Sequence, residues 1–320
     1  MLLGFDIGGT KCAVVLGEKH GEEKINIVDK VVVPTDKSVQ EMMEALFHTA
    51  DVLMAKNEVA NNRLKGIGIS CGGPLNSKSG LILSPPNLPG WDNIAIVDIV
   101  EKRFGRNAYL QNDANACAVA EWKYGAGRGY ENIIFLTFGT GMGAGLILNG
   151  KLYSGTSDHA GEAGHMRLAD VGPVGFGKSG SFEGFCSGGG IAQLARMKAM
   201  EKMQMGERTS FCNGIDDLPS ITAKAIAEAA YKGDALAIDI YKTSATYLGK
   251  GISLLMDLLN PEVIVIGGIY VRAQTLLETT MMEVIEKEVL QGAYRNCKIV
   301  PAQLAENIGD IAALALADQE

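Results

Sequence analysis

Short apolar runs separated by glycine-containing turns predict the strands in the first third of the chain. Apolar residues dominate positions 2 to 7, 11 to 17 and 25 to 33, and each run has the length of a single strand. The segment from 38 to 56 has helical spacing, with one apolar face formed by Met43, Leu46, Phe47, Ala50 and Leu53. Strands followed by helices are typical of an α/β fold.

The same patterns predict the remaining elements. Further strands are expected near 65 to 70, 108 to 111, 133 to 136, 144 to 148, 261 to 266 and 298 to 301. Further helices are expected near 95 to 105, 113 to 124, 187 to 203, 220 to 231, 233 to 259, 273 to 288 and 308 to 317. Between 153 and 190 the chain is rich in Gly, Ser and His, which predicts a long functional loop.

Composition narrows the class of protein. The 320 residues are 47% hydrophobic, which is enough for the cores of two domains. The net charge of −8 and the lack of a basic run make nucleic acid an unexpected partner. The six cysteines are scattered singly, and Met1 leads directly into a predicted strand. We therefore expect a soluble cytoplasmic protein with reduced thiols and no membrane segment.

Two glycine-threonine turns follow apolar strands at distant points of the chain. The first is Asp6-Ile7-Gly8-Gly9-Thr10-Lys11, and the second is Thr137-Phe138-Gly139-Thr140-Gly141-Met142-Gly143. Glycine permits positive φ and close approach to a ligand, and exposed N–H groups with a threonine hydroxyl can bind phosphate oxygens. Each turn alone is equally well explained as a tight hairpin. Their repetition, with an acid in the first, favours a nucleotide polyphosphate site.

Two further groups carry candidate chemistry. Asn112 and Asp113 stand where a strand gives way to a helix, so Asp113 is either a helix cap or a general base for a hydroxyl. Glu162 and His165 are three residues apart in the Gly-rich segment, and Glu183 follows. These three are either structural or a set of donors and acceptors for the hydroxyls of a sugar.

Six motifs in order make the chain resemble the ROK family of sugar kinases and repressors. They are Asp6 to Lys11, Asn112 to Ala116, Gly139 to Gly143, Gly161 to His165, Asn260 to Gly268, and Gly309-Asp310. The resemblance implies an α/β fold of two lobes, the actin-like ATPase (ribonuclease H-like) fold with an internal duplication. It places the smaller lobe at 1–112 plus about 302–320, the larger at 113–301, and the active-site cleft between them.

The resemblance also implies a role for each motif. Asp113 matches the catalytic base, and Asp6 is similar to the acid that holds hydrated Mg²⁺ beside ATP. The positions that match sugar ligands are Asn87, Asn112, Asp113, Glu162, His165 and Glu183. The positions that match nucleotide contacts are Asp6, Gly8, Gly9, Thr10, Lys11, Gly139, Thr140, Gly141, Gly267 and Gly268.

One segment departs from the family pattern. Most members hold a structural zinc with the histidine that matches His165 and with three cysteines, but those cysteine positions here are Val174, Phe176 and Ser181. Zinc sites normally need four N, S or carboxylate ligands, so we predict that no zinc is bound. Burial of Val174 and Phe176 is expected to hold the loop instead.

The resemblance implies ATP-dependent phosphorylation of a hexose, most often on carbon 6. Glucose is the favoured acceptor, with N-acetylmannosamine or fructose as alternatives. Two other classes of protein are less expected. A sugar-responsive repressor needs a DNA-binding domain, which the sequence does not show, and a catalytically silent sugar-binding module would not need Asp113. Related kinases are often dimers, so a homodimer is expected.

Overall fold

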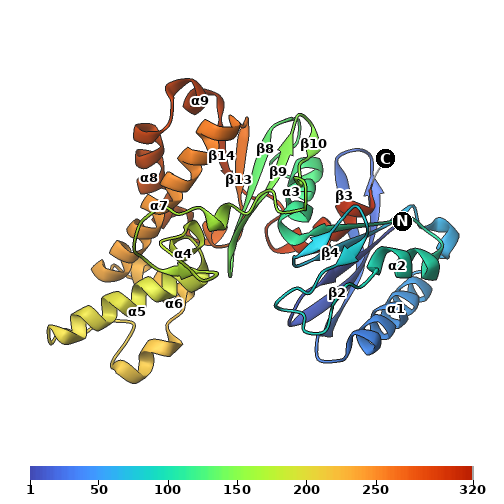
Figure 1. Ribbon diagram of the computed structural model, residues 1–320, viewed down its shortest axis with the longest axis horizontal. Coiled ribbons are helices and arrows are strands. Elements are labelled where there is room, and N and C mark those ends of the chain that lie inside the picture. The colour runs from blue at the N-terminus through green and yellow to red at the C-terminus, as the bar shows by residue number, and fades with distance from the viewer. Residues whose placement is uncertain (319–320) are drawn as a thin grey trace. The chain divides into compact units, whose positions relative to one another are not determined.

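A five-stranded sheet organises the first part of the chain in the computed structural model, which describes residues 1–318 (Figure 1). Its strand order is β3-β2-β1-β4-β7. The strands are β1 (Leu2–Ile7), β2 (Lys11–His20), β3 (Lys24–Pro34), β4 (Gly66–Cys71) and β7 (Ala108–Asn112). β2 is antiparallel to β1 and β3, whereas β4 is parallel to β1 and β7. The carboxyl ends of β1, β4 and β7 therefore lie at one edge of the sheet, where α/β proteins bind ligands.

Helices cover both faces of this sheet. Leu3, Phe5 and Ile7 share a buried core with α1 (Val39–Lys56) and α2 (Ile96–Phe104). Because side chains alternate along a strand, Gly4 belongs to the other face, where α10 (Ile308–Ala317) and α3 (Asp113–Tyr124) pack. A Cβ added at Gly68 would lie 1.8 Å from the Ala313 carbonyl oxygen, so glycine is required where α10 crosses β4.

A second sheet repeats the order of the first. Its order is β10-β9-β8-β13-β14. β8, β9 and β10 occupy the places of β1, β2 and β3 in the first sheet, and β13 and β14 occupy those of β4 and β7. Its strands are β8 (Ile133–Phe138), β9 (Met142–Leu148), β10 (Lys151–Leu152), β13 (Val263–Ile266) and β14 (Lys298–Pro301). The predicted α/β class and internal duplication are confirmed, and the strand order is that of the ribonuclease H-like, actin-like ATPase fold.

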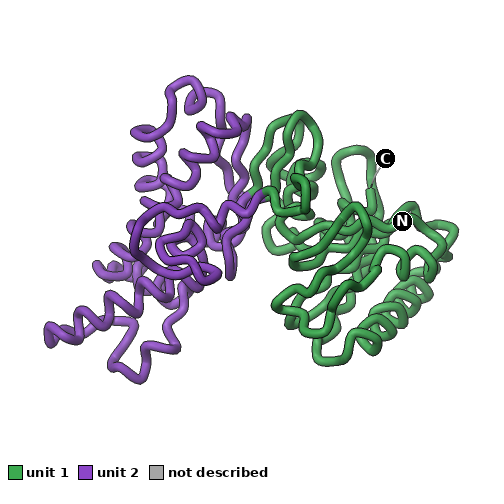
Figure 2. Tube along the Cα trace, viewed as in Figure 1, with its two compact units in different colours: residues 1–135, 145–160, 303–320 green, residues 136–144, 161–302 purple. Residues whose placement is uncertain are grey.

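The residues divide by their contacts into two units (Figure 2). The first, unit 1, contains residues 1–135 and 145–160 and the chain from 303; unit 2 contains 136–144 and 161–302. The helices of unit 2 are α4 (Phe182–Phe185), α5 (Gly188–Gln204), α6 (Ala223–Tyr231), α7 (Ala235–Leu259), α8 (Ile269–Glu288) and α9 (Gln291–Asn296). Side chains of Ser187, Thr222 and Asp234 cap the starts of α5, α6 and α7.

Several expected boundaries differ in unit 2. The helix expected from 273 begins at Ile269, directly after Gly268, and the non-helical backbone of Ala273 bends its first turn. The helix expected from 220 to 231 is α6, which begins only at Ala223 because Thr222 caps its start, and a 3₁₀ turn, Ile215–Ser220, precedes it. The expected loop contains the hairpin of β11 (Val174–Gly175) and β12 (Lys178–Ser179). Within residues 1–318, no helix combines the length and apolarity that a bilayer span requires.

Candidate active site

The first glycine turn connects β1 to β2 and is braced by neighbouring backbone. The Gly8 N–H donates to the Lys11 carbonyl at 3.2 Å, which closes the turn. The Thr35 hydroxyl donates to the Gly8 carbonyl at 2.7 Å, and the Thr35 N–H donates to the Thr10 carbonyl at 3.0 Å. A Cβ at Gly9 would lie only 2.3 Å from the Asn87 carbonyl oxygen. The expected phosphate turn and the loop of a predicted sugar ligand are therefore in contact within unit 1.

Asp6, at the end of β1, is the acid of that turn. Burial, together with the negative charges of Asp310 and Asp113, raises the pKa of its carboxyl to about 6, and Lys30 and the hydrogen bond from Ser70 oppose this rise. Asp310 itself is buried and pairs with Lys30 at 2.6 Å. A half-buried carboxylate in the field of two other acids favours a cation, and carboxylate oxygen is a ligand that Mg²⁺ prefers. The donor set around Asp6 thus fits a hydrated magnesium ion.

Asn112 and Asp113 lie at the start of α3. The Asn112 Oδ1 accepts from the Asn115 N–H at 2.8 Å, so Asn112 is the helix cap and its amide nitrogen is left to donate. Asp113 is the first helical residue, and its carboxylate accepts from the Ala114 N–H at 2.8 Å. Although solvent reaches Asp113, the protein atoms around it displace enough water to raise the pKa of its carboxyl. A raised pKa suits a group that accepts a proton during a reaction.

The second glycine turn connects β8 to β9 and is braced by side chains. The Thr137 hydroxyl accepts from the Gly143 N–H at 2.9 Å. One carboxylate oxygen of Glu183, Oε2, accepts from the Met142 N–H at 3.0 Å, and a Cβ at Gly141 would approach the same oxygen to 2.7 Å. Glu183, predicted as a sugar ligand, therefore contacts the second turn directly.

Gly267 and Gly268 lie beneath that same turn. The Gly267 N–H donates to the Leu136 carbonyl at 2.9 Å. Gly268 has a φ of +63°, and a Cβ added there would lie 2.1 Å from the Phe138 carbonyl oxygen. Only glycine fits there. In the described chain neither glycine-threonine turn contains a glycine with positive φ, so at Gly9 and Gly141 close approach, rather than a left-handed backbone, favours glycine.

A pocket of about 900 Å³ opens beside Gly139 and Thr140 within unit 2. Such a volume is typical of a small-molecule site. Sequence reasoning missed most of its lining, which comes from the starts of α5 and α8 and from the length of α6, and includes Gly188, Gly189, Lys224, Tyr231, Ile269 and Arg272. The Gly188 N–H donates to the Gly139 carbonyl at 2.8 Å, which joins α5 to the turn. The run of three glycines from 188 to 190 was the signal that could have revealed this wall.

Glu162 and His165 lie at the two ends of one 3₁₀ turn, η2 (Ala163–His165). The His165 N–H donates to the Glu162 carbonyl at 3.1 Å, and both residues are exposed. The His165 ring packs edge-on against Phe176, with 5.4 Å between ring centres. The pair is thus held by backbone, with both side chains accessible to a ligand.

The expectation that buried Val174 and Phe176 hold this segment was wrong. Val174 is 45% exposed and Phe176 is 74% exposed, so neither forms a core. The segment is held by hydrogen bonds instead: the Gln193 side chain bonds both the N–H and the carbonyl of Val174. The fully buried Ser181 hydroxyl accepts from the Gly184 N–H at 3.1 Å. Polar side chains satisfy the loop backbone here because the β11–β12 hairpin is too short to bury its own side chains.

The residues present do not fit a zinc site. A side-chain hydroxyl and two apolar side chains replace the three thiolates, and zinc needs nitrogen, sulfur or carboxylate ligands. Cys186 is fully buried, and its thiol donates to the Ser244 carbonyl at 3.4 Å. Across residues 1–318, no three His, Cys, Asp or Glu side chains cluster in a way that could hold a metal.

Comparison with known proteins identifies the family. The model of the ROK family matches residues 2–320. A glucokinase of Streptomyces coelicolor is 29% identical over 99% of this chain and 97% of its own length. The structure of a ROK family glucokinase from Streptomyces griseus in complex with glucose and AMPPNP has a TM-score of 0.76 and 29% identity, covering 100% and 99% of the two chains. A xylose repressor of Caldicellulosiruptor bescii is 28% identical over 98% of this chain and 77% of its own. This chain belongs to the ROK family.

Proposed function

We propose that this protein is an ATP-dependent hexose kinase that phosphorylates the carbon-6 hydroxyl, with glucose as the favoured acceptor. The observation that carries the proposal is the position of Asp113, an accessible carboxyl of raised pKa at the junction of β7 and α3, in the same unit as Asp6 and its turn. The whole-length similarity to glucokinases, one of them bound to glucose and AMPPNP, supports it.

Asp113 acts as the general base. Its carboxylate accepts the proton of the carbon-6 hydroxyl as the oxygen forms a bond to the γ-phosphorus, and ADP leaves with the electron pair of the broken bond. The free amide nitrogen of Asn112 donates to a neighbouring hydroxyl, because its oxygen is already engaged by Asn115. Asn87, Glu162, His165 and Glu183 supply the other hydroxyl contacts.

The glycine turns hold the phosphates. Gly9 and Thr10 offer N–H groups and Lys11 offers its charge, and Thr140 and Gly141 offer N–H groups at the second turn, whereas the N–H groups of Gly8 and Gly139 close their own turns. Bound Mg²⁺ would neutralise charge on the phosphates, with Asp6 as its protein ligand through water. The adenosine occupies the pocket beside Gly139, above Gly267 and Gly268, where Tyr231 and Ile269 provide apolar surface.

Sugar-dependent release of ADP tests the proposal. A coupled assay with glucose, N-acetylmannosamine, fructose and mannose should give the highest kcat/KM for glucose. Asp113→Asn keeps the size and the Ala114 hydrogen bond but lacks the base, so kcat should fall by roughly 10²- to 10⁴-fold. The matched control is Asp239→Asn, an exposed acid on α7, which should retain full activity. Full activity in Asp113→Asn would refute the assigned base.

A sugar-responsive regulator is the second candidate, because a xylose repressor aligns with 98% of this chain. A regulator needs sugar binding without turnover. Calorimetric binding of a sugar, with no ADP formed in the presence of ATP and Mg²⁺, would favour this candidate over the kinase.

Assembly and location complete the proposal. We infer a cytoplasmic homodimer that binds no nucleic acid. Light scattering coupled to gel filtration should give a mass of about twice the 33.9 kDa chain, and a monomer across micromolar concentrations would contradict it.

A further inference from the structure

A groove in unit 1, distinct from the pocket of unit 2, contains none of the residues assigned to the kinase reaction. Its volume is about 590 Å³, within the range of small-molecule sites. It is lined by β7, α2, α3 and β10 and by the turn between β5 (Leu75–Asn76) and β6 (Leu81–Ile82). Gln111 in this lining directly precedes Asn112 on β7. The groove thus shares a strand with the proposed acceptor site but is a separate cavity.

The charged groups of the groove are mainly cationic. Lys78, Lys123 and Lys151 line it, against the single carboxylate of Asp98. Lys78 and Lys151 are exposed, and within residues 1–318 neither forms an ion pair. Two uncompensated ammonium groups in one concave site attract an anion.

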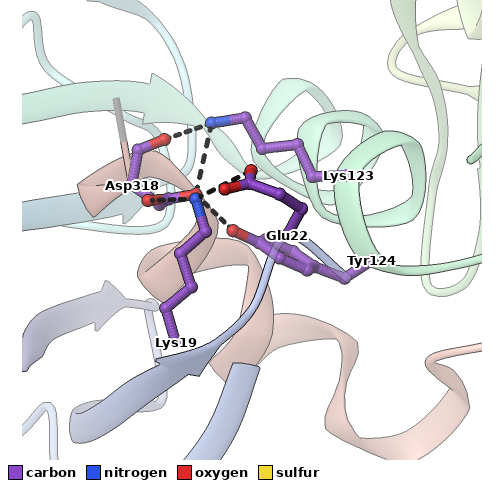
Figure 3. Close-up of polar contacts among 5 residues, drawn as sticks. All are labelled: Lys19, Glu22, Lys123, Tyr124 and Asp318. Atoms are coloured by element: carbon purple, nitrogen blue, oxygen red, sulfur yellow. Dashed lines mark hydrogen bonds and ion pairs between the residues drawn. The ribbon is translucent and has the colours of Figure 1, made fainter. Parts of the chain in front are cut away.

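Lys123 differs from the other two lysines because it already has partners. Its Nζ donates to the Asp318 backbone carbonyl and lies 3.9 Å from the Asp318 carboxylate (Figure 3). Lys19 and Tyr124 bind the same carboxylate, which joins β2, α3 and the end of α10. Asp318 therefore offsets the charge of Lys123, while Lys78 and Lys151 are available to contact a ligand.

An aromatic wall accompanies the charges. The Trp122 Nε1 donates to the Tyr130 carbonyl at 3.0 Å, which fixes the indole, and the half-buried ring lines the groove together with Val97 and Leu110. A fixed indole is a good surface for the apolar C–H face of a ring. Tyr109 and Gln111 add polar groups for hydroxyls.

We propose that this groove binds a small phosphate ester that carries a ring, such as a phosphorylated sugar. Lys78 and Lys151 contact the phosphate as point charges. Trp122 packs against the ring, and the polar side chains of β7 contact its hydroxyls. Neither an uncharged sugar nor a purely apolar ligand would use both features.

Fluorescence can follow this site alone. The chain has two tryptophans, of which Trp91 is buried at 2% exposure and Trp122 lines the groove. Titration of the whole protein with glucose 6-phosphate should change Trp122 emission saturably, and Trp122→Phe should abolish the change. Inorganic phosphate and AMP serve as separate arms that distinguish a phosphate requirement from a preference for a sugar or a nucleoside.

Charge removal tests the lysines. The double variant Lys78→Ala/Lys151→Ala should raise the Kd for glucose 6-phosphate at least tenfold, because each substitution removes one contact to the phosphate. The matched control, Lys24→Ala/Lys102→Ala, removes the same charge from exposed positions outside the groove and should leave Kd within twofold. An equal loss in both double variants, or no loss in the first, would overturn the proposal.

Product binding at the acceptor site must be separated from binding in the groove. Calorimetry should find two sites for glucose 6-phosphate in the unmodified protein and one in Lys78→Ala/Lys151→Ala, whose kcat without added phosphate ester should be unchanged. Because fluorescence reports the groove whether or not turnover occurs, failure of the kinase proposal leaves this test intact. One site in both proteins, with Trp122 silent, would refute the groove.

Discussion

The two glycine-threonine turns occupy the same place in two sheets of the same strand order, yet their surroundings differ. In sequence register, Asp6 before the first turn corresponds to Thr137 before the second. Asp6 is a half-buried acid with a raised pKa, whereas Thr137 is a neutral group that holds the turn together through the Gly143 N–H. The first turn thus carries an acid that could hold a cation, and the second turn has a hydroxyl in its place.

The space around the two turns differs as well. A Cβ at Gly9 would meet backbone, the Asn87 carbonyl, whereas a Cβ at Gly139 would have no heavy atom within 4 Å. The first turn is therefore packed against protein, and the second borders open space beside the 900 Å³ pocket. Backbone cannot move aside as a flexible side chain can, so the first turn should tolerate substitution less.

Loss of the acid should have the largest effect. Asp6→Asn keeps the shape and the hydrogen bond to Ser70 but cannot bind a cation as a carboxylate does, so kcat should fall by about 10²- to 10³-fold. Thr137→Asn, at the matching position of the second turn, is the comparison and should reduce kcat less than tenfold. Equal losses, measured with saturating Mg²⁺ and ATP, would contradict the division of roles.

The same acid should make stability depend on pH. The pKa of Asp6 rises from 3.8 to about 6 on folding, so the folded state binds more protons between these values. The free energy of unfolding should therefore fall as pH rises from 4 to 6, by up to about 3 kcal/mol from this group. Asp6→Asn should remove that contribution.

Denaturant unfolding at pH 4 and pH 7 measures this difference. Asp6→Asn should be more stable than the unmodified protein at pH 7, and the two should converge near pH 4. Magnesium with ATP should stabilise the unmodified protein at pH 7 more than the variant, which retains its phosphate contacts but lacks the acid. If the difference in stability between the unmodified protein and Asp6→Asn did not change with pH, folding would not raise the pKa of Asp6 as described.

Much of the fold was predictable because it depends on local signals. Apolar runs indicate most strands and helices, and Ser38 and Asp234 mark the starts of α1 and α7. The two glycine-threonine hairpins indicate the internal duplication. The start of α8 was misplaced because Ala273 breaks the helical backbone without a Pro or Gly to signal it. Boundaries of that kind depend on tertiary packing, which for α8 is mainly against α7.

The candidate site was predictable only in part. The motifs gave the identity of Asp113 and both turns, but not that Asn112, rather than Asp113, caps α3. They also did not show that Glu183 binds the Met142 N–H, because residues 41 positions apart meet only in the folded chain. The pocket wall from α6 and Arg272 lacks any motif, since its members share only their position in space.

Alanine in place of glycine should separate the two turns by steric contact. Gly9→Ala should destabilise the protein by about 2 kcal/mol, because its Cβ would lie 2.3 Å from the Asn87 oxygen and must displace that loop. The KM for hexose should rise with it, since Asn87 is a proposed sugar ligand. Gly139→Ala should leave stability within about 0.5 kcal/mol and raise the KM for ATP instead. Thermal unfolding and steady-state kinetics on both variants test the contrast, and a raised hexose KM in Gly139→Ala would break it.

The smallest effect should come from the hydroxyls that brace each turn. Thr35→Val and Thr137→Val preserve shape but remove a hydroxyl that makes one short hydrogen bond, at 2.7 and 2.9 Å, and one longer contact, at 3.3 and 3.4 Å. Thr35 donates to the Gly8 carbonyl, which also receives the Cys12 thiol at 3.8 Å, so its loss should cost about 0.5 to 1 kcal/mol. Thr137 accepts from the Gly143 N–H, a group with a single donor, so its loss should cost about 1 to 1.5 kcal/mol. Thr→Ser at each position keeps the hydroxyl and should recover most of the loss in denaturant unfolding. If Thr35→Val proved the costlier of the two, the first turn would depend on its hydroxyl more than on the backbone packed against Gly9.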